Sequence, residues 1–490
     1  MVIKKRLVSR FFIFFFIFYC LKLIFIYDKI KKDNKNLGYF KMNSKMEKNH
    51  TKNNHYPFQN ERILTPKKFL FVSLESLSGD LALQIKKEGH EVKAFIENQE
   101  DKDVYDGFLE KVDDWRKFIK WADVVVFDDI GFGTEADSLR SRGKLVVGGS
   151  KYTDKLEEDR EFGQNEMKRV GMPILAHWDF ADFDSAIDFI KKNPGGYVFK
   201  PSGTIASDQK GILFLSQDED GKDLIEILEQ NKKTWAKKIK KFQLQKMAVG
   251  VEVAVGAFFN GKDFALPLNI NFEHKKLFPG DIGPYTGEMG TLMFWSQPNE
   301  IFNSTLLKIK DNLAKSGYVG YIDINCIANA KGIYPLEFTS RFGYPTISIQ
   351  IEGVIEPWGD FLYRLSKHEA TEFKTKKGFQ IGVVVAVPPF PYDDKKESFI
   401  YKDLSIIFKK QNLEGVHLGD VKLINDVWVI AGNSGYVLVI TASGSTVEEA
   451  RRQVYSRLKN ILIQNMYYRT DIGFKWFSDS DRLQTWGYLH

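Results

Sequence analysis

The chain of 490 residues has few of the features that assign a protein to a specialised class. Its only two cysteines, Cys20 and Cys326, provide no disulfide framework, so a reducing compartment such as the cytoplasm fits best. It has neither a zinc-type spacing of cysteine and histidine nor an RNA-binding signature, which disfavours nucleic-acid binding. With 43% hydrophobic and 27% charged residues, the composition is that of an ordinary globular protein with two or three domains.

Long hydrophobic runs are also rare, and the one that stands out is Phe11 to Tyr27 near the amino terminus. Basic residues flank it and supply much of the net charge of +6, so it could be a membrane anchor. However, Lys22 interrupts it, and a transmembrane helix needs about 20 apolar residues. The alternative is upstream sequence read in frame, with translation starting at Met42 or Met46. Both interpretations stay open for residues 1–62. Under the first interpretation, the chain would contact a membrane only through residues 11–27.

From Lys67 onward, short apolar strands alternate with helical stretches, which indicates an α/β domain with an open, mainly parallel, Rossmann-like sheet at residues 63–150. The loop after the first strand, residues 74–80, lacks the Gly-x-Gly-x-x-Gly motif, so dinucleotide binding is disfavoured. The expected elements are strands at 69–74, 92–96, 124–127 and 145–147 and a helix at 80–89.

The rest of the chain is typical of two further domains, at residues 151–375 and 376–490, with mixed α/β and α+β character. We expect one helix from Lys155 to Val170 and a strand at 196–200. Three strands at 242–247, 252–259 and 264–270 look antiparallel. The last domain should be a small α+β unit with strands at 381–387, 427–430 and 436–441 and a helix at 447–460.

Residues Asp323 to Arg341 carry the clearest chemical pattern. Because side chains alternate along a strand, Asp323 and Asn325 share one face of the first strand, and Glu337 and Thr339 share one face of the next. A three-residue turn ending in a left-handed Gly332 would place Asn325 opposite Glu337 and Asp323 opposite Thr339. Oxygen ligands on rigid strands suit Mg²⁺, although an ordinary half-solvated hairpin alternates in the same way. The adjacent Arg341 favours the functional interpretation, since arginine grips phosphate or carboxylate with two hydrogen bonds.

Two other segments have features of ligand-binding loops. Lys200 ends an apolar strand just before a polar loop of small residues at 201–211, where it could neutralise phosphate charge. A lysine at a strand end is more often simply solvated. The second segment, Gly280 to Gly290, has too many glycines for a passive linker, which favours close approach of backbone to a ligand. The preceding Glu273 to Lys276 could form a cationic cluster for a phosphorylated substrate or could merely be solvated.

In order along the chain, these motifs resemble the ATP-grasp superfamily and, within it, the phosphoribosylamine-glycine ligases (glycinamide ribonucleotide synthetases). The resemblance covers about residues 67–476. Residues 283–290 are similar to the family's Gly-Pro-Asn-Thr-Gly-Gly-Met-Gly, and residues 336–345 to its Glu-Phe-Asn-x-Arg-Phe-Gly-Asp-Pro. Residues 416–419, 446–450 and 468–473 resemble the family's last domain.

The resemblance implies a fold: an ATP-grasp domain between a Rossmann-like first domain and a small carboxy-terminal domain. It also implies ATP as a substrate with Mg²⁺ or Mn²⁺, and glycine and phosphoribosylamine as partners in an amide-forming step of purine biosynthesis. Catalysis would depend on alignment and charge neutralisation, mainly by Lys200 and Arg341. A monomer or homodimer is expected. The implied nucleotide contacts are Arg160, Lys200, Gln245, Lys246, Met247 and Glu252. The implied substrate contacts are Glu273, His274, Lys275, Gly287 and Arg341, and the implied metal ligands are Asp323, Glu337 and Thr339.

The chain departs from this family at several positions. Thr339 replaces a metal-binding asparagine, while Asp323 and Asn325 resemble the extra acid that other ATP-grasp ligases carry on the preceding strand. Arg160 replaces a lysine, Glu288 a glycine and Tyr344 an aspartate. The family's Gly-rich loop ending in Gly-Arg-Glu-His-Ala is absent from the first domain. Two alternatives therefore remain beside the leading hypothesis: a ligase for a different acid or amine, and a nucleotide-binding relative without turnover.

Overall fold

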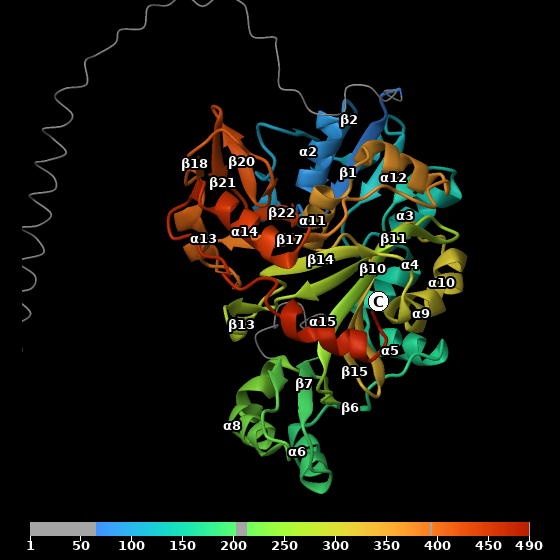
Figure 1. The fold of residues 1–490 in the computed structure, drawn as a ribbon, viewed down its shortest axis with the longest axis vertical. Coiled ribbons are helices and arrows are strands. Elements are labelled where there is room, and N and C mark those ends of the chain that lie inside the picture. The colour runs from blue at the N-terminus through green and yellow to red at the C-terminus, as the bar shows by residue number, and fades with distance from the viewer. Residues whose placement is uncertain (1–64, 202–212, 393, 490) are drawn as a thin grey trace, which may run out of the picture. The chain divides into compact units, whose positions relative to one another are not determined.

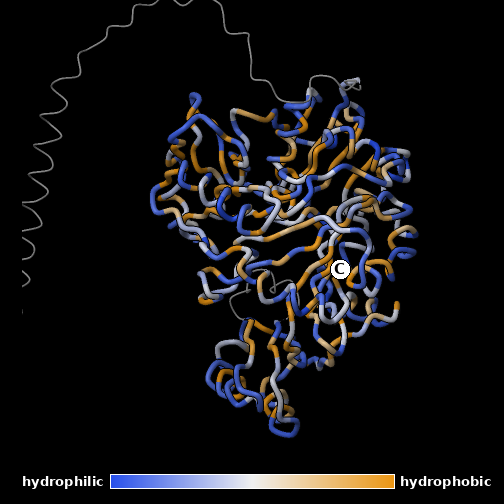
Figure 2. The backbone as a smooth tube through the Cα atoms, viewed as in Figure 1, coloured by the Kyte–Doolittle hydropathy of each residue, from blue (hydrophilic) through white to orange (hydrophobic). Residues whose placement is uncertain are grey.

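A computed structural model describes residues 65–201, 213–392 and 394–489 (Figure 1). The amino-terminal apolar run and most of the loop after Lys200 lie outside these residues. By its contacts, Ile63–His490 forms one unit. Among the described residues, none of the helices combines the length and apolar character needed to cross a bilayer. Hydrophobic segments follow the strands of the sheets, whereas outer helices and turns are mainly hydrophilic (Figure 2).

The first sheet is parallel, as expected, with the strand order β3-β2-β1-β4-β5. Its central strands are apolar and buried on both faces because helices cover them. The helix predicted at 80–89 is observed as α2. The elements are β1 (Lys68–Ser73), α2 (Gly79–Lys87), β2 (Glu91–Ile96), β3 (Glu110–Lys111), β4 (Val124–Phe127), α3 (Gly133–Ser141) and β5 (Leu145–Val147), with short 3-10 turns at Gln99–Asp101 and Trp115–Phe118.

The helix predicted from Lys155 to Val170 is instead two helices, α4 (Lys151–Glu158) and α5 (Arg160–Arg169). The break lies at Asp159, whose backbone is extended and whose carboxylate accepts a hydrogen bond from the Phe162 backbone N–H at 3.0 Å. Asp159 is therefore the N-cap of a new helix, a role that aspartate commonly has. As a result, Arg160 lies in the first turn of α5.

A small antiparallel sheet with the order β6-β9-β7-β8 has its own core, formed with α6 and α8. The strand predicted at 242–247 is observed here as β9 and is antiparallel to its neighbours, as expected, but it does not share a sheet with the strands at 252–259 and 264–270. It pairs instead with β6 and β7. The elements are β6 (His177–Phe180), α6 (Phe183–Lys192), β7 (Tyr197–Pro201), β8 (Phe214–Leu215), α8 (Lys222–Lys238) and β9 (Phe242–Lys246).

The largest sheet is antiparallel, with the order β16-β15-β10-β11-β14-β17-β22-β19. It continues past residue 375, because β17 pairs with β14 and β22 pairs with β17. The predicted strands at 381–387 and 436–441 thus extend the same sheet, whereas the one at 427–430 is β21 (Val427–Ile430) and pairs with β20 (Val421–Ile424) in a separate hairpin. Its strands are β10 (Val251–Phe259), β11 (Phe264–Glu273), β14 (Gly290–Ser296), β15 (Gly320–Asn329), β16 (Gly332–Thr339), β17 (Phe379–Ala386), β19 (Val416–Leu418) and β22 (Tyr436–Gly444).

The remaining elements connect or cover the three sheets. The Gly-rich segment at 280–290 contains a strand of the small hairpin β12–β13. The remaining helices are α9 (Glu300–Ser304), α10 (Leu306–Lys315), α11 (Thr346–Gly353), α12 (Trp358–Ser366), α13 (Lys395–Tyr401), α14 (Val447–Leu458) and α15 (Trp476–Thr485). The short strands are β12 (Lys276–Phe278), β13 (Ile282–Tyr285), β18 (Ile407–Phe408), β20 (Val421–Ile424), β21 (Val427–Ile430) and β23 (Ile461–Leu462).

Candidate functional site

The β15–β16 hairpin has the predicted register, with Asp323 opposite Thr339 and Asn325 opposite Glu337. The predicted three-residue turn was wrong, because Asn329 pairs with Gly332 and only two residues separate them. A register shift after Asn325 adds one unpaired residue in β16, which restores the expected pairing. Asp323 and Glu337 therefore lie on the same face of the hairpin, as predicted. The turn is one residue shorter than predicted, and the register shift compensates for it.

Asp323 and Asn325 are deeply buried, with 3% and 5% of their surface exposed, whereas the Glu337 side chain is 55% exposed. Among the described residues, the Oδ1 atoms of Asp323 and Asn325 have no hydrogen-bond partner. Burial, together with the charge of Glu273, raises the pKa of Asp323 to about 8, and a hydrogen bond from Thr339 opposes this rise. Buried oxygens without partners are costly and mark a place for a ligand, a cation or water.

Lys275 joins three carboxylates on the same face of the sheet. Its Nζ lies 2.9 Å from Glu252 on β10, 3.4 Å from Glu273 on β11 and 3.9 Å from Glu337 on β16. Burial alone would lower the pKa of Lys275, but these three carboxylates raise it well above its usual value. The structure thus brings together four residues that were predicted separately, as metal, nucleotide and substrate contacts.

Lys200, at the end of β7, lies close enough to this group for their charges to interact. Burial and the charge of Arg160 lower the pKa of Lys200 to about 7, while Glu337 and Glu252 raise it and Lys275 lowers it. Arg160 and Lys200, both implied contacts of the nucleotide, are therefore close enough for their charges to interact. We call Arg160, Lys200, Glu252, Lys275 and Glu337 the phosphate end of the site, because its cations are those suited to a polyphosphate.

Arg341 is held by two carboxylates that the sequence did not single out. Its Nε lies 3.1 Å from Glu157 on α4 and 3.4 Å from Asp129 after β4. Glu157 also accepts a hydrogen bond from the Ser340 backbone N–H at 2.7 Å. Burial alone would lower the pKa of Arg341, but Glu157, Asp129 and Asp323 raise it. Glu157 and Asp129 come from distant segments, so spacing along the chain gave no signal for them.

The predicted cationic cluster at 273–276 is not formed. His274 directly follows the last residue of β11 and is almost completely buried. Burial and the nearby Lys475 and Arg469 lower the pKa of His274 to about 3, so this ring is uncharged at neutral pH. The expected positive charge on His274 is therefore wrong, whereas its contact with a substrate stays a prediction.

Gly287, predicted as a substrate contact, lies in an exposed turn before β14, and a Cβ there would meet open space. The adjacent Gly290 has a structural role instead. Its φ is +146°, and a Cβ would lie 2.5 Å from the Gly382 carbonyl oxygen. Close packing against β17 accounts for this glycine, whereas the space around Gly287 is compatible with the predicted ligand.

The strand predicted beside the adenine, Gln245 to Met247, forms the end of β9 and the residue after it. The Lys246 backbone N–H donates to Ala176 and the Met247 N–H to Gly196, at 2.7 and 3.0 Å. Gln245 is buried, and Lys246 is exposed with its Nζ 5.0 Å from the centre of the Tyr197 ring. These two backbone donors are used within the small sheet.

The carboxyl edge of the five-stranded sheet, where ligands bind in open α/β folds, is lined by acids. At the start of α2, the Asp128 carboxylate accepts from the Ser78 N–H at 3.0 Å, and the Tyr105 hydroxyl accepts from the Gly79 N–H at 2.9 Å. Burial raises the pKa of Asp128 to about 7. Burial and the charge of Asp101 raise the pKa of Asp420 to about 8.

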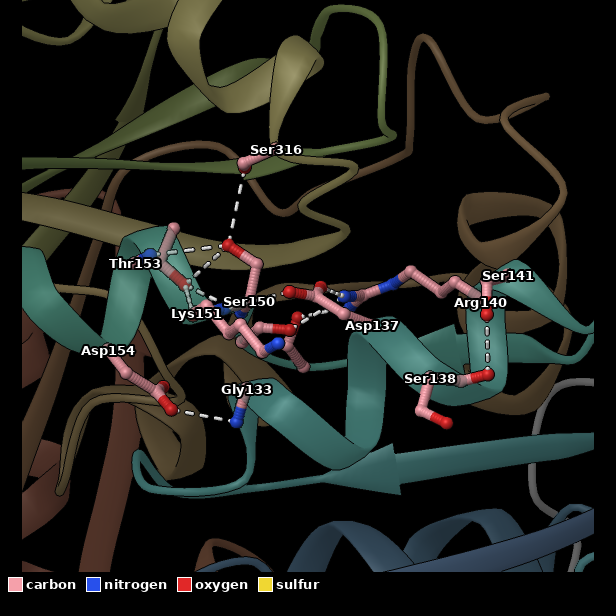
Figure 3. A network of polar contacts seen from close by, with 12 residues as sticks. Gly133, Asp137, Ser138, Arg140, Ser141, Ser150, Lys151, Thr153, Asp154 and Ser316 are labelled. Atoms are coloured by element: carbon pink, nitrogen blue, oxygen red, sulfur yellow. Dashed lines mark hydrogen bonds and ion pairs between the residues drawn. The ribbon is translucent and has the colours of Figure 1, made fainter.

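A backbone N–H group at the start of α3 is also hydrogen-bonded within the chain. Asp154 on α4 accepts a hydrogen bond from the Gly133 N–H at 2.7 Å (Figure 3). Ser150 caps α4 through a capping box with Thr153, and its Oγ lies 3.3 Å from the Ser316 hydroxyl (Figure 3). These helix N-termini, which would otherwise attract anions, are satisfied by the chain itself.

Among the residues that the structure describes, no group of three or more Asp, Glu, His or Cys side chains is arranged so that it could hold a metal ion. Mg²⁺, however, takes only one or two protein carboxylates and completes its shell with phosphate oxygens and water. The unpartnered oxygens of Asp323 and Asn325, on the same face as Glu337, fit that requirement.

Comparisons with known proteins identify relatives of a single family. Residues 158–347 match the phosphoribosylglycinamide synthetase ATP-grasp (A) domain, and residues 380–475 match the C domain of the same enzyme. A phosphoribosylamine–glycine ligase from Streptococcus pneumoniae is 26% identical over 366 residues, which cover 73% of this chain and 84% of that protein.

Solved structures show the same fold. The crystal structure of a phosphoribosylamine–glycine ligase from Thermotoga maritima has a TM-score of 0.62 at 23% identity, over 83% of this chain and 100% of that one. The biotin carboxylase domain of a 2-oxoglutarate carboxylase from Hydrogenobacter thermophilus, solved with ADP and magnesium, has a TM-score of 0.55 at 13% identity, over 86% and 96% of the two chains. The two matching domains, in order and together with the curated relatives, show that the chain belongs to the phosphoribosylamine-glycine ligase family of the ATP-grasp superfamily.

Proposed function

We propose that the chain is an ATP-dependent ligase that joins the carboxylate of glycine to the amine of phosphoribosylamine, as the name of its relatives describes. The γ-phosphate of ATP is transferred to the glycine carboxylate, and ADP leaves. The amine then attacks the acyl phosphate, so an amide forms and phosphate and a proton are released. This places the chain in purine biosynthesis, and the low cysteine content is compatible with the cytoplasm.

The observation that carries this proposal is the phosphate end, where Arg160, Lys200 and Lys275 meet Glu252 and Glu337 across two sheets. No side chain has to act as a nucleophile, so catalysis rests on alignment and neutralisation of charge. Lys200, with its lowered pKa, is poised to gain a proton and bind when an anion arrives. Lys275 is fixed by three carboxylates and needs no reorganisation.

Asp323, Asn325 and Glu337 are the residues we propose to hold Mg²⁺ or Mn²⁺, with Thr339 supporting Asp323 by a hydrogen bond. When bound, the ion neutralises charge on the phosphate oxygens. Arg341, fixed by Glu157 and Asp129, lies at the end of β16 beside these residues, where we propose that it faces the substrates. Gln245 to Met247 and Gly287 remain proposed contacts of the nucleotide and the substrate.

Release of ADP by the purified full chain tests the proposal. We expect ADP release that needs Mg²⁺, glycine and phosphoribosylamine together, since the acyl phosphate turns over only when the amine removes it. ATP hydrolysis that ignores glycine would contradict it. Light scattering on the same sample tests the expected monomer or homodimer.

A ligase acting on a different amine is the second candidate. The observation that favours it is the carboxyl edge of the first domain, where Asp128 and Tyr105 already occupy the start of α2. A phosphate group would find no helix N-terminus there to bind. A screen of ADP release across amines with and without a phosphate group separates the two candidates, because only the leading one requires the phosphorylated sugar.

A further inference from the structure

Glu288 is a buried acid whose carboxyl is only partly satisfied by the described residues. It lies just before β14 and has 7% of its surface exposed, and its Oε1 is buried with no hydrogen-bond partner among the described residues. It also stands where the family motif has glycine. A buried carboxylate without a partner costs several kcal/mol in general, so a retained one indicates a cationic ligand or a similar compensating group.

Glu288 interacts electrostatically with residues on the Asp323 face of the large sheet and with Tyr436 of β22. Glu273 and Asp323 are near enough for their charges to act on the Glu288 carboxyl, and Glu288 in turn acts on Tyr436 at the start of β22. The Oδ1 of Asp323 and the hydroxyl of Tyr436 are also buried without partners among the residues described. These unpartnered atoms lie on β15, on β22 and on the segment just before β14, so three separate parts of the chain contribute them.

Lys275 is the cation whose charge acts on Glu288, but its ammonium group is in contact with other carboxylates. Its Nζ makes its close contacts with Glu252 at 2.9 Å and Glu273 at 3.4 Å. The cluster therefore has more carboxylates than cations, and its unpartnered acceptors suit an ammonium group, which donates three hydrogen bonds.

We propose that Glu288 binds the α-ammonium group of the amino-acid substrate and so acts as a specificity-determining residue. This inference rests on the proposed function and names the substrate class of the same site. In glycine, one methylene carbon separates the ammonium group from the carboxylate, so both groups must be bound within one small pocket. The proximity of Glu288 to Asp323 and Lys275 meets that requirement, because the carboxylate then points to the phosphate end.

The consequence is selection of amino acids over simple carboxylic acids. An acid such as glycolate, which has a hydroxyl in place of the ammonium group, would leave the buried Glu288 carboxyl without a cationic partner. Sites built around a buried polar group reject substrates that lack its partner far more strongly than apolar pockets reject a missing methylene.

The test compares the full chain with Glu288→Gln, which keeps the shape of the side chain and removes its charge. ADP release is measured with glycine and with glycolate, and glycine binding is measured by calorimetry with ADP and Mg²⁺ present. We expect a KM for glycine about 10 to 100 times higher in the variant, the loss expected for one charged hydrogen bond. The KM for ATP should not change, and the preference for glycine over glycolate should fall. Glu97→Gln, an exposed acid in the first domain, is the matched control.

The possible outcomes separate this inference from the proposed function. If glycine binds the full chain and Glu288→Gln weakens that binding, the inference stands even when no ADP is released. If glycine-dependent ADP release occurs and the variant keeps the KM for glycine, the inference is overturned while the function stands. If the full chain neither binds glycine nor releases ADP with it, both are overturned.

Discussion

The phosphate end of the large sheet and the carboxyl edge of the first sheet are both places where related folds bind ligands, yet they differ in charge. At the phosphate end, the cations Lys200, Lys275 and Arg160 lie near Glu252 and Glu337. At the carboxyl edge, Asp128 and Asp420 are buried together with tyrosines. We therefore propose that the first region accepts a polyphosphate, whereas in the second region the chain's own side chains already occupy the anion-binding positions.

The pKa values express the same contrast. At the phosphate end a lysine has its pKa lowered to about 7, because burial and other cations disfavour its charge. At the carboxyl edge two aspartates have their pKa raised to about 7 and about 8, because burial and other acids disfavour theirs. Each region is thus short of a partner of opposite sign: an anion in the first and a cation in the second.

The largest effect should come from Lys200→Met, which removes the buried cation of the phosphate end. We expect kcat/KM for ATP to fall about 100- to 1000-fold, the range seen when one preorganised charge contact is lost. Steady-state ADP release measures this. Lys331→Met, in the exposed β15–β16 turn, is the control and should keep wild-type kinetics. An unchanged kcat/KM in Lys200→Met would contradict the proposal that the phosphate end binds ATP.

Lys275→Met should destabilise the fold by about 2 to 4 kcal/mol, because the loss of one partner leaves charges that are uncompensated in a partly buried site. Glu252, Glu273 and Glu337 would then repel one another. Urea unfolding measures the change, and Mg²⁺ should restore more stability to the variant than to the wild type. Equal responses to Mg²⁺ would show that no cation binds among these glutamates.

Asp128→Asn should change how stability depends on pH. The folded state raises the pKa of Asp128 from about 3.8 to about 7, so its contribution to stability is present below pH 3.8 and is lost as pH rises through 7. We expect the variant to lose about 2 kcal/mol less than the wild type between pH 5 and 8, the order set by a shift of a few units. Unfolding at a series of pH values measures this, with the exposed Asp113→Asn as control. Parallel curves for the two proteins would contradict the prediction.

The smallest effect is uptake of a fraction of a proton when nucleotide binds. Lys200 has a pKa of about 7 in the free protein, and phosphate favours its charged form, so above pH 7 binding should draw a proton from solution. Calorimetry of ADP binding in buffers of different ionisation enthalpy at pH 8 measures this. The same uptake in Lys200→Met would assign the proton to another group.

The sequence alone predicted the parallel sheet and the hairpin register, because apolar strands and alternation are local signals. The register was right although the turn was wrong, since the extra residue in β16 compensates for the shorter turn. The break between α4 and α5 was missed because the cap at Asp159 interrupts an otherwise helical pattern.

Other features depend on contacts between distant segments. Glu157 and Asp129 hold Arg341 from α4 and from the end of β4, more than 180 residues away in sequence. The lowered pKa of His274 depends on its burial and on the charges of Lys475 and Arg469, which are distant in sequence, so no local pattern reveals it. The assignment of β9 to the small sheet likewise depends on pairing with β6 and β7.

The central claim is that the acid substrate is activated as an acyl phosphate at the phosphate end. Glycine labelled with ¹⁸O in both carboxylate oxygens tests it most directly, with the released phosphate analysed by mass spectrometry. If the acyl phosphate forms, one labelled oxygen must leave with phosphate when the amine attacks the carbonyl carbon. We predict one ¹⁸O in each phosphate released during amide formation. Unlabelled phosphate accompanying amide formation would contradict the account.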